Sequence, residues 1–248
     1  MSKRFPGKEE IRAFYDRFGS MQDWQRFYEG AAIRDLLRYG RFDIASSVFE
    51  LGCGTGSFAL GLLRRHLPET ASYVGVDISS TMARLAGKRL VPFAGRARIL
   101  HTDGSLRFGF PDGSFDRFVA VYVLDLLSPD EIVQVFGEAY RLLRNEGRIC
   151  LVSLTFGQTV LSRTVTWIWK GIHNLNPLLV GGCRPLKLRR FLEEECWNIS
   201  HHKFVNVMGI ASEIVVAVKI TGKLQHHENS GVSPWVLLNS DNKRLSGH

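Results

Sequence analysis

Short apolar runs alternate with longer amphipathic stretches between residues 47 and 155. The runs that predict strands cover residues 48–51, 73–76, 97–101, 115–121 and 148–153. The stretches that predict helices cover residues 57–66, 80–90 and 129–143, and the last two follow serines that can cap a helix. Strands that alternate with helices in this way predict an α/β fold with a doubly wound, mostly parallel sheet.

The segments on either side complete the predicted architecture. Residues 10–44 carry an aromatic-rich helical pattern, which predicts a helical cap at the N-terminal end of the domain. After the fifth strand the alternation pauses in an apolar insertion at 157–184, followed by a helix at 185–195. Runs at 203–208 and 213–220 predict two further strands, so we expect seven strands in one domain spanning residues 1–222. Residues 223–248 are expected to form a polar tail.

A glycine-rich stretch, VFELGCGTGSFA, follows the first strand at the edge where parallel α/β sheets bind ligands. Gly52, Gly54 and Gly56 leave backbone without side chains, which suits either a dinucleotide or S-adenosylmethionine. Glu50 would repel a pyrophosphate but attract the ammonium group of a methionine moiety. Asp77 ends the second strand, where a carboxylate can accept hydrogen bonds from ribose hydroxyls. These two acids favour S-adenosylmethionine over NAD.

Four segments together resemble the class I S-adenosylmethionine-dependent methyltransferases: ELGCGTG at 50–56, GVDIS at 75–79, Asp103 after the third strand, and FDRFV at 115–119. Within that class the chain is most similar to the type 11 branch, which includes the ubiquinone and menaquinone C-methyltransferases. The resemblance implies a Rossmann-like fold, S-adenosylmethionine as cofactor, and an adenine pocket beside Ile78 and Asp103. The cofactor-binding residues it implies are Glu50, Gly52, Cys53, Gly54, Gly56, Asp77, Ile78, Asp103, Gly104 and Val121.

Methyl transfer is an in-line displacement, so positioning can supply much of the rate and a base is needed only for a protonated acceptor. The candidate catalytic residues are Tyr122, Asp125 and His173, and the candidate substrate contacts are Tyr15, Trp169 and Arg184. Each also has a plain structural interpretation. The aromatic residues can pack in the core, Asp125 can begin a helix, His173 can lie on the surface, and Arg184 can cap a carbonyl.

The charge and the cysteine content limit which classes of partner and ligand we expect. The net charge of +8 suits an anionic partner, but the basic residues are scattered, which disfavours nucleic acid as the substrate. The four cysteines lack metal-ligand spacing and predict free thiols and no metal site. The N-terminal residues show no apolar leader, and no uncharged apolar run is long enough to span a bilayer, so we expect a cytoplasmic protein.

The insertion bears on the substrate. Its apolar residues, Trp169 among them, fall at helical spacing and predict a lid over an apolar, medium-to-large acceptor. The same pattern also fits peripheral association of residues 160–180 with a membrane surface. The first hypothesis is therefore methylation of a quinone- or phenol-like or lipid-related small molecule. The alternatives are an RNA or protein methyltransferase and a non-catalytic binding protein with this fold; the sequence leaves the oligomeric state undetermined.

Overall fold

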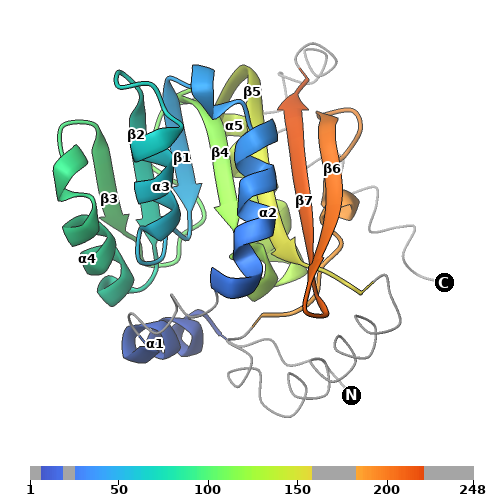
Figure 1. The fold of residues 1–248 in the computed structure, drawn as a ribbon, viewed down its shortest axis with the longest axis horizontal. Coiled ribbons are helices and arrows are strands. Elements are labelled where there is room, and N and C mark those ends of the chain that lie inside the picture. Colours follow the sequence, from blue (N-terminus) through green and yellow to red (C-terminus); the bar gives the residue numbers. More distant parts are fainter. Residues whose placement is uncertain (1–6, 19–25, 158–182, 221–248) are drawn as a thin grey trace, which may run out of the picture.

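A seven-stranded sheet forms the centre of the computed structural model, which describes residues 7–18, 26–157 and 183–220 (Figure 1). The strand order is β3-β2-β1-β4-β5-β7-β6. Strands β1 to β5 are parallel, and β7 runs antiparallel to both β5 and β6. The strands are β1 (Ser47–Leu51), β2 (Ser72–Asp77), β3 (Ala97–His101), β4 (Phe115–Val121), β5 (Leu143–Leu154), β6 (Trp197–Val207) and β7 (Ile210–Lys219). The predicted α/β fold with seven mostly parallel strands is confirmed.

Helices cover both faces of the sheet and enclose two apolar layers (Figure 1). The helices are α1 (Lys8–Phe18), α2 (Arg26–Tyr39), α3 (Ser57–Arg65), α4 (Ser80–Arg89) and α5 (Pro129–Leu142). Helix α5 buries Ile132 and Phe136 against Phe49 of β1, whereas α2 and α3 pack on the opposite face around Val48. Successive residues of β1 therefore point to opposite faces, as the two-residue period of a strand requires.

Side-chain caps fix the helices next to the ligand-binding edge. The Ser79 hydroxyl accepts a hydrogen bond from the Met82 amide at 3.1 Å and begins α4. Ser128 and Glu131 form a reciprocal capping box at the start of α5. Both caps were predicted from the sequence, and both lie in loops that follow the carboxyl end of a strand.

Several boundaries differ from the predictions. The helix predicted at 185–195 is wrong, since only a 3-10 turn forms at Leu188–Phe191. Leu186 instead forms a parallel bridge with Thr155, and its amide donates to the Leu154 carbonyl at 2.8 Å, so the segment begins in an extended conformation. β5 begins directly after α5 because Leu143 already pairs with Phe115, and β6 begins at Trp197. The N-terminal helical pattern forms two separate helices, α1 and α2.

Part of the predicted architecture lies outside the described residues. This applies to the bulk of the 157–184 insertion, with Trp169 and His173, and to the tail at 223–248. Among the described helices, none combines the length and the apolar character needed to cross a membrane. The described part of the chain also contains no cluster of metal-ligating side chains.

Candidate cofactor site

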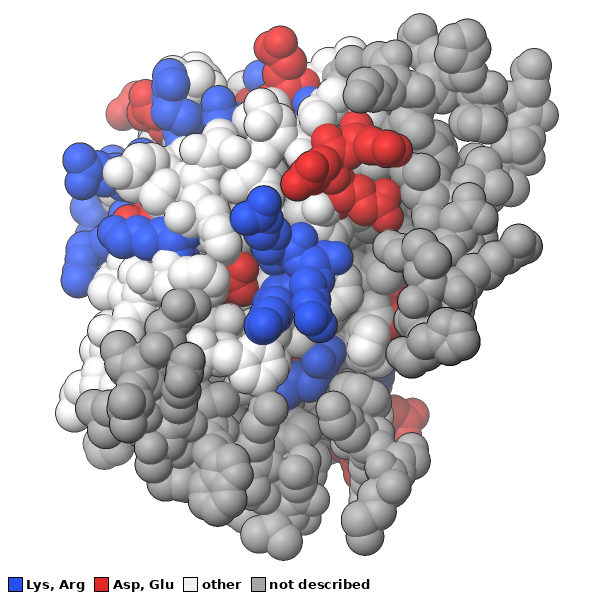
Figure 2. Space-filling model, turned by 90° about the vertical axis from the view of Figure 1, so that its right-hand side faces the viewer, with Lys and Arg blue, Asp and Glu red and all other residues white. Residues whose placement is uncertain are grey.

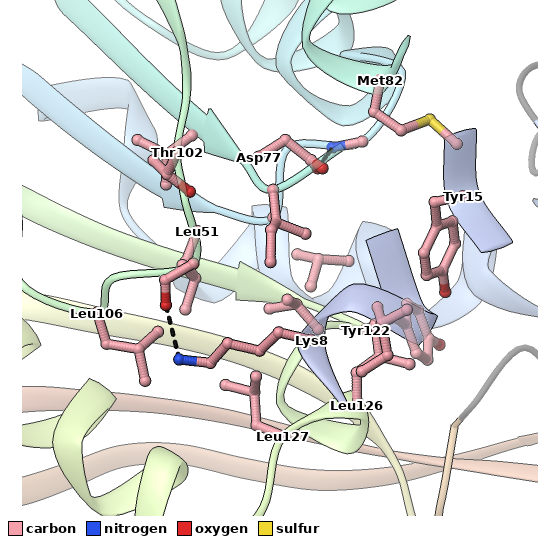
Figure 3. A pocket seen from close by; sticks show the side chains of 18 of the residues that line it. Lys8, Tyr15, Leu51, Asp77, Met82, Thr102, Leu106, Tyr122, Leu126 and Leu127 are labelled. Carbon is pink, nitrogen blue, oxygen red and sulfur yellow. Dashed lines mark hydrogen bonds between the residues drawn. The ribbon is translucent and has the colours of Figure 1, made fainter. Parts of the chain in front are cut away.

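A pocket of about 830 Å³, its open mouth included, lies at the carboxyl ends of β1, β2 and β4 (Figure 3). Its walls come from those strand ends, the loop after β3, the 3-10 turn at Leu124–Leu126 and helix α1. The lining residues are Lys8, Ile11, Tyr15, Leu51, Gly52, Gly54, Val76, Asp77, Ile78, Met82, Thr102, Gly104, Ser105, Leu106, Val121, Tyr122, Val123, Leu126 and Leu127. The volume is in the range typical of small-molecule sites.

The glycine loop forms part of the pocket wall with bare backbone. Gly52 has φ of 68°, and a Cβ there would stand 2.5 Å from Cγ2 of Val123. Gly54 has φ of 53° and also lines the pocket. Gly56 serves a different purpose, because a Cβ at this position would meet Cα of Ala86 at 3.0 Å. The first two glycines open the cavity, and the third lets α3 approach α4.

Asp77 is held in place by the backbone on both sides of the cavity. Its Oδ2 accepts the Gly54 amide at 2.8 Å and its Oδ1 accepts the Ser79 amide at 2.9 Å. Burial raises the pKa of this carboxyl above its usual range, although the two amides oppose the shift. Each carboxylate oxygen has a second lone pair, so Asp77 can still accept a hydroxyl from a ligand.

The loop after β3 provides a mixed polar and apolar wall beside Ile78. Thr102, Gly104, Ser105 and Leu106 line the pocket there. Asp103 is exposed, and its carboxylate accepts the Ser105 amide at 2.8 Å, which is a turn contact. The sequence thus indicates the correct loop. The other residues of this loop could have been predicted as pocket residues because they directly follow the end of a parallel strand.

Glu50, at the start of the glycine loop, and Cys53 within it are buried and do not line the pocket. Glu50 is 2% exposed, and its Oε2 accepts the Tyr73 hydroxyl at 2.5 Å. Burial, followed by the charge of Asp77, raises the pKa of Glu50 to about 8, while the Tyr73 hydrogen bond opposes that rise. Burial also raises the pKa of the Cys53 thiol. These groups support the loop from below.

Helix α1 closes one side of the pocket and is pinned near both ends. The Lys8 ammonium donates to the Gly104 carbonyl at 2.8 Å, the contact drawn in Figure 3. Eight residues later, Asp16 accepts the Ser79 hydroxyl at 2.6 Å and the Thr81 amide at 3.1 Å. Tyr15, one of the predicted substrate contacts, lines the cavity between these anchors.

The side opposite Asp77 is largely apolar. Leu126 and Leu127 lie there together with Tyr122 (Figure 3), and Val121 and Val123 also line the pocket. Tyr122 adopts a left-handed conformation with φ of 52°, and its hydroxyl lies 2.7 Å from Oγ of Ser212. A strained tyrosine at the end of a strand is a common feature of functional sites.

Two other candidates lie beneath this wall instead of in it. Asp125 is fully buried, and burial raises the pKa of its carboxyl to about 7. The Arg184 amide donates to the Asp125 carbonyl at 3.1 Å, and its guanidinium donates to the Leu127 carbonyl. Arg184 therefore braces the turn that carries Leu126 and Leu127, which is the capping interpretation of this residue.

The arrangement fits S-adenosylmethionine. Bare backbone at Gly52 and Gly54 leaves room for a chain with polar groups, and a buried acid at the end of β2 suits a ribose diol. Apolar side chains of Ile78 and Leu106 suit the faces of an adenine ring.

Comparisons with known proteins agree with this geometry. Residues 48–147 match the methyltransferase domain family. A tRNA N(3)-methylcytidine methyltransferase, Mettl2 of Drosophila melanogaster, is 27% identical over 146 residues, covering 58% of this chain and 43% of that protein. A demethylmenaquinone methyltransferase of Porphyromonas gingivalis is 28% identical over 168 residues, covering 66% of this chain and 62% of that protein. The chain thus spans less than two thirds of either relative.

The fold also matches that of a solved methyltransferase. The geranyl diphosphate C-methyltransferase of Streptomyces coelicolor, in complex with Mg²⁺, geranyl diphosphate and S-adenosyl-L-homocysteine, superposes with a TM-score of 0.65 at 13% identity. The alignment covers 89% of this chain and all of that one. At this identity the match concerns the fold alone. Together with the domain match and the glycine loop, it identifies the chain as carrying a class I S-adenosylmethionine-dependent methyltransferase domain.

Proposed function

We propose that this protein transfers a methyl group from S-adenosylmethionine to an apolar or amphipathic small molecule, either a quinone- or phenol-like ring or a lipid-related acceptor. The observation that supports the proposal is that one side of the pocket is polar and the other side is apolar. Asp77 and the glycine loop provide polar groups on one side, and Leu126 and Leu127 provide apolar side chains on the other (Figure 3). An apolar wall stabilises an apolar acceptor by removing its surface from water.

The cofactor supplies a methyl group on a sulfonium, and the chain positions and shields the reactants. Asp77 would bind the ribose, and the loop at 102–106 with Ile78 would hold the adenine. Tyr122 and Tyr15 line the cavity and would contact the acceptor. Asp125 is too deeply buried to touch an acceptor, so we assign it to the turn that shapes the apolar wall. The roles predicted for Trp169 and His173 remain predictions.

An RNA acceptor is the second candidate, because one relative is a tRNA methyltransferase. The described surface does not favour it. On the face shown in Figure 2, basic side chains gather in small groups next to acidic ones. Among the described residues, Arg189 and Glu194 form one such pair of opposite charges, 3.8 Å apart. A binding surface for RNA usually presents a stripe of one sign.

Two assays test the proposal. Calorimetric titration of the protein with S-adenosylmethionine, S-adenosylhomocysteine and NAD should give binding of the two sulfur compounds alone. Incubation with S-adenosylmethionine labelled on the methyl group should then transfer label to demethylated quinones, phenols or lipid amines. Asp77→Ala serves as the matched inactive control. Label found only in tRNA or protein would replace the small-molecule proposal, and binding of NAD alone would refute the cofactor assignment.

A further inference from the structure

The face of the sheet behind the glycine loop carries a buried pair that the proposed function does not use. Tyr73 of β2 and Glu50 of β1 are 1% and 2% exposed, and the tyrosine hydroxyl donates to Oε2 of the glutamate at 2.5 Å. Glu50 lies opposite Gly75 in the parallel register, so Tyr73 reaches diagonally across to the neighbouring strand. Diagonal neighbours on one face lie within reach of a long aromatic side chain.

Gly75 makes this reach possible. A Cβ at Gly75 would stand 2.6 Å from the Tyr73 hydroxyl oxygen, 2.9 Å from Cβ of Cys53 and 3.0 Å from Cδ1 of Ile99. The phenol therefore occupies the space that a side chain at Gly75 would fill. Because Cys53 belongs to the glycine loop, the same contacts place the Tyr73–Glu50 pair directly against that loop.

Two buried acids lie close to the glycine loop. Glu50 and Asp77 are both buried acids, and the charge of Asp77 contributes to the raised pKa of Glu50. His101 favours the ionised form of Asp77, whereas the ionised form of Glu50 is favoured by the hydrogen bond from Tyr73. A ligand that brings an ammonium group to the loop would favour the ionised form of Glu50.

We propose that Tyr73 is a positioning residue that holds the Glu50 carboxylate beneath the glycine loop and so makes the site selective for cofactors with an amino-acid end. This inference rests on the proposed function, because it assigns a determinant of cofactor recognition. Without the hydroxyl, Glu50 would lose both its orientation and the hydrogen bond that supports its charge. The affinity of adenosine compounds that lack the ammonium group would not change.

The test compares two ligands by calorimetric titration of the full chain. S-adenosylhomocysteine has the amino-acid end, and 5′-methylthioadenosine has the same nucleoside and thioether without it. Tyr73→Phe should weaken S-adenosylhomocysteine about tenfold, the effect of losing one hydrogen bond to a charged group. It should leave 5′-methylthioadenosine unchanged. Equal weakening of both ligands, or of neither, would overturn the proposal.

Two further variants keep the test decisive. Tyr140→Phe is the matched control, because it removes a tyrosine hydroxyl that donates to the Ile220 carbonyl at 3.0 Å away from the pocket, and both affinities should stay unchanged. Glu50→Gln should show the same ligand-selective loss, and adding Tyr73→Phe to it should cost nothing further. An additive double variant would overturn the proposal. Failure of the unmodified protein to bind either ligand would instead refute the proposed function itself.

Discussion

Replacing Asp77 by alanine tests the role of the buried acid at the end of β2. In the structure Asp77 accepts two backbone amides, from Gly54 at 2.8 Å and from Ser79 at 2.9 Å. These contacts use one lone pair on each oxygen, and the remaining lone pairs would receive the two ribose hydroxyls. The substitution removes both proposed ligand contacts and also the brace between the glycine loop and α4.

The expected loss follows from the strength of these contacts. Hydrogen bonds to charged groups contribute about 1.5–3 kcal/mol each, but burial already disfavours the ionised form of Asp77, which reduces their sum. We expect Asp77→Ala to weaken binding of S-adenosylhomocysteine by about 1–3 kcal/mol, or roughly 5- to 150-fold in Kd. Calorimetric titration measures the change, and circular dichroism confirms that the variant is folded.

Asp103→Ala is the matched control for this experiment. Asp103 is an acid of the same type in the adjacent loop, but it is exposed and bonded to the Ser105 amide. Its substitution should leave the Kd within about twofold, since exposed turn contacts contribute little. An unchanged Kd for Asp77→Ala would refute the ribose assignment. An equal loss for Asp103→Ala would show that the adenine loop is used differently.

Three other outcomes follow from the packing and burial of the site. Gly52→Ala should weaken cofactor binding more than tenfold in calorimetry, because its Cβ would meet Val123 at 2.5 Å on a backbone with φ of 68°. Asp125→Asn should reduce the pH dependence of the free energy of unfolding between about pH 4 and pH 7. The pKa of this carboxyl is raised to about 7, so its stabilising contribution is lost as pH rises from about 4 to 7, at up to ~1.4 kcal/mol per pH unit. The four cysteines are buried, and burial raises the pKa of each thiol, so native protein should react slowly with a thiol reagent and denatured protein fast.

The sheet could be predicted because its signals are local. Five apolar runs, most of them separated by amphipathic helices, predict a mostly parallel sheet, and the capping serines mark where α4 and α5 begin. The structure of the region after Thr155 is harder to predict, because it depends on contacts between residues far apart in the chain. Leu186 pairs with Thr155 across 31 residues, which keeps the start of this segment extended where the local pattern favours a helix.

The residues of the site also fall into two groups, those that a local pattern predicts and those that depend on long-range contacts. Gly52, Gly54, Asp77 and Ile78 lie in the pocket because strand ends in a parallel sheet converge on one edge, which the sequence pattern already implies. The contribution of α1 could not be predicted from local pattern. Lys8 reaches the Gly104 carbonyl across 96 positions, a tertiary contact without a local signature.

The position of Glu50 depends both on a local pattern and on a long-range contact. Strand alternation places it on the same face of β1 as Val48, the face that α2 and α3 cover, and away from Phe49 and Leu51. An acid on a buried face needs a partner, and the sequence alone does not say which residue provides it. The register of β1 against β2 supplies the answer, because it sets Gly75 opposite Glu50 and leaves the Tyr73 hydroxyl a path to the carboxylate. If the amino-acid end of the cofactor depends on Glu50, it therefore depends as well on a glycine and a tyrosine that never line the pocket.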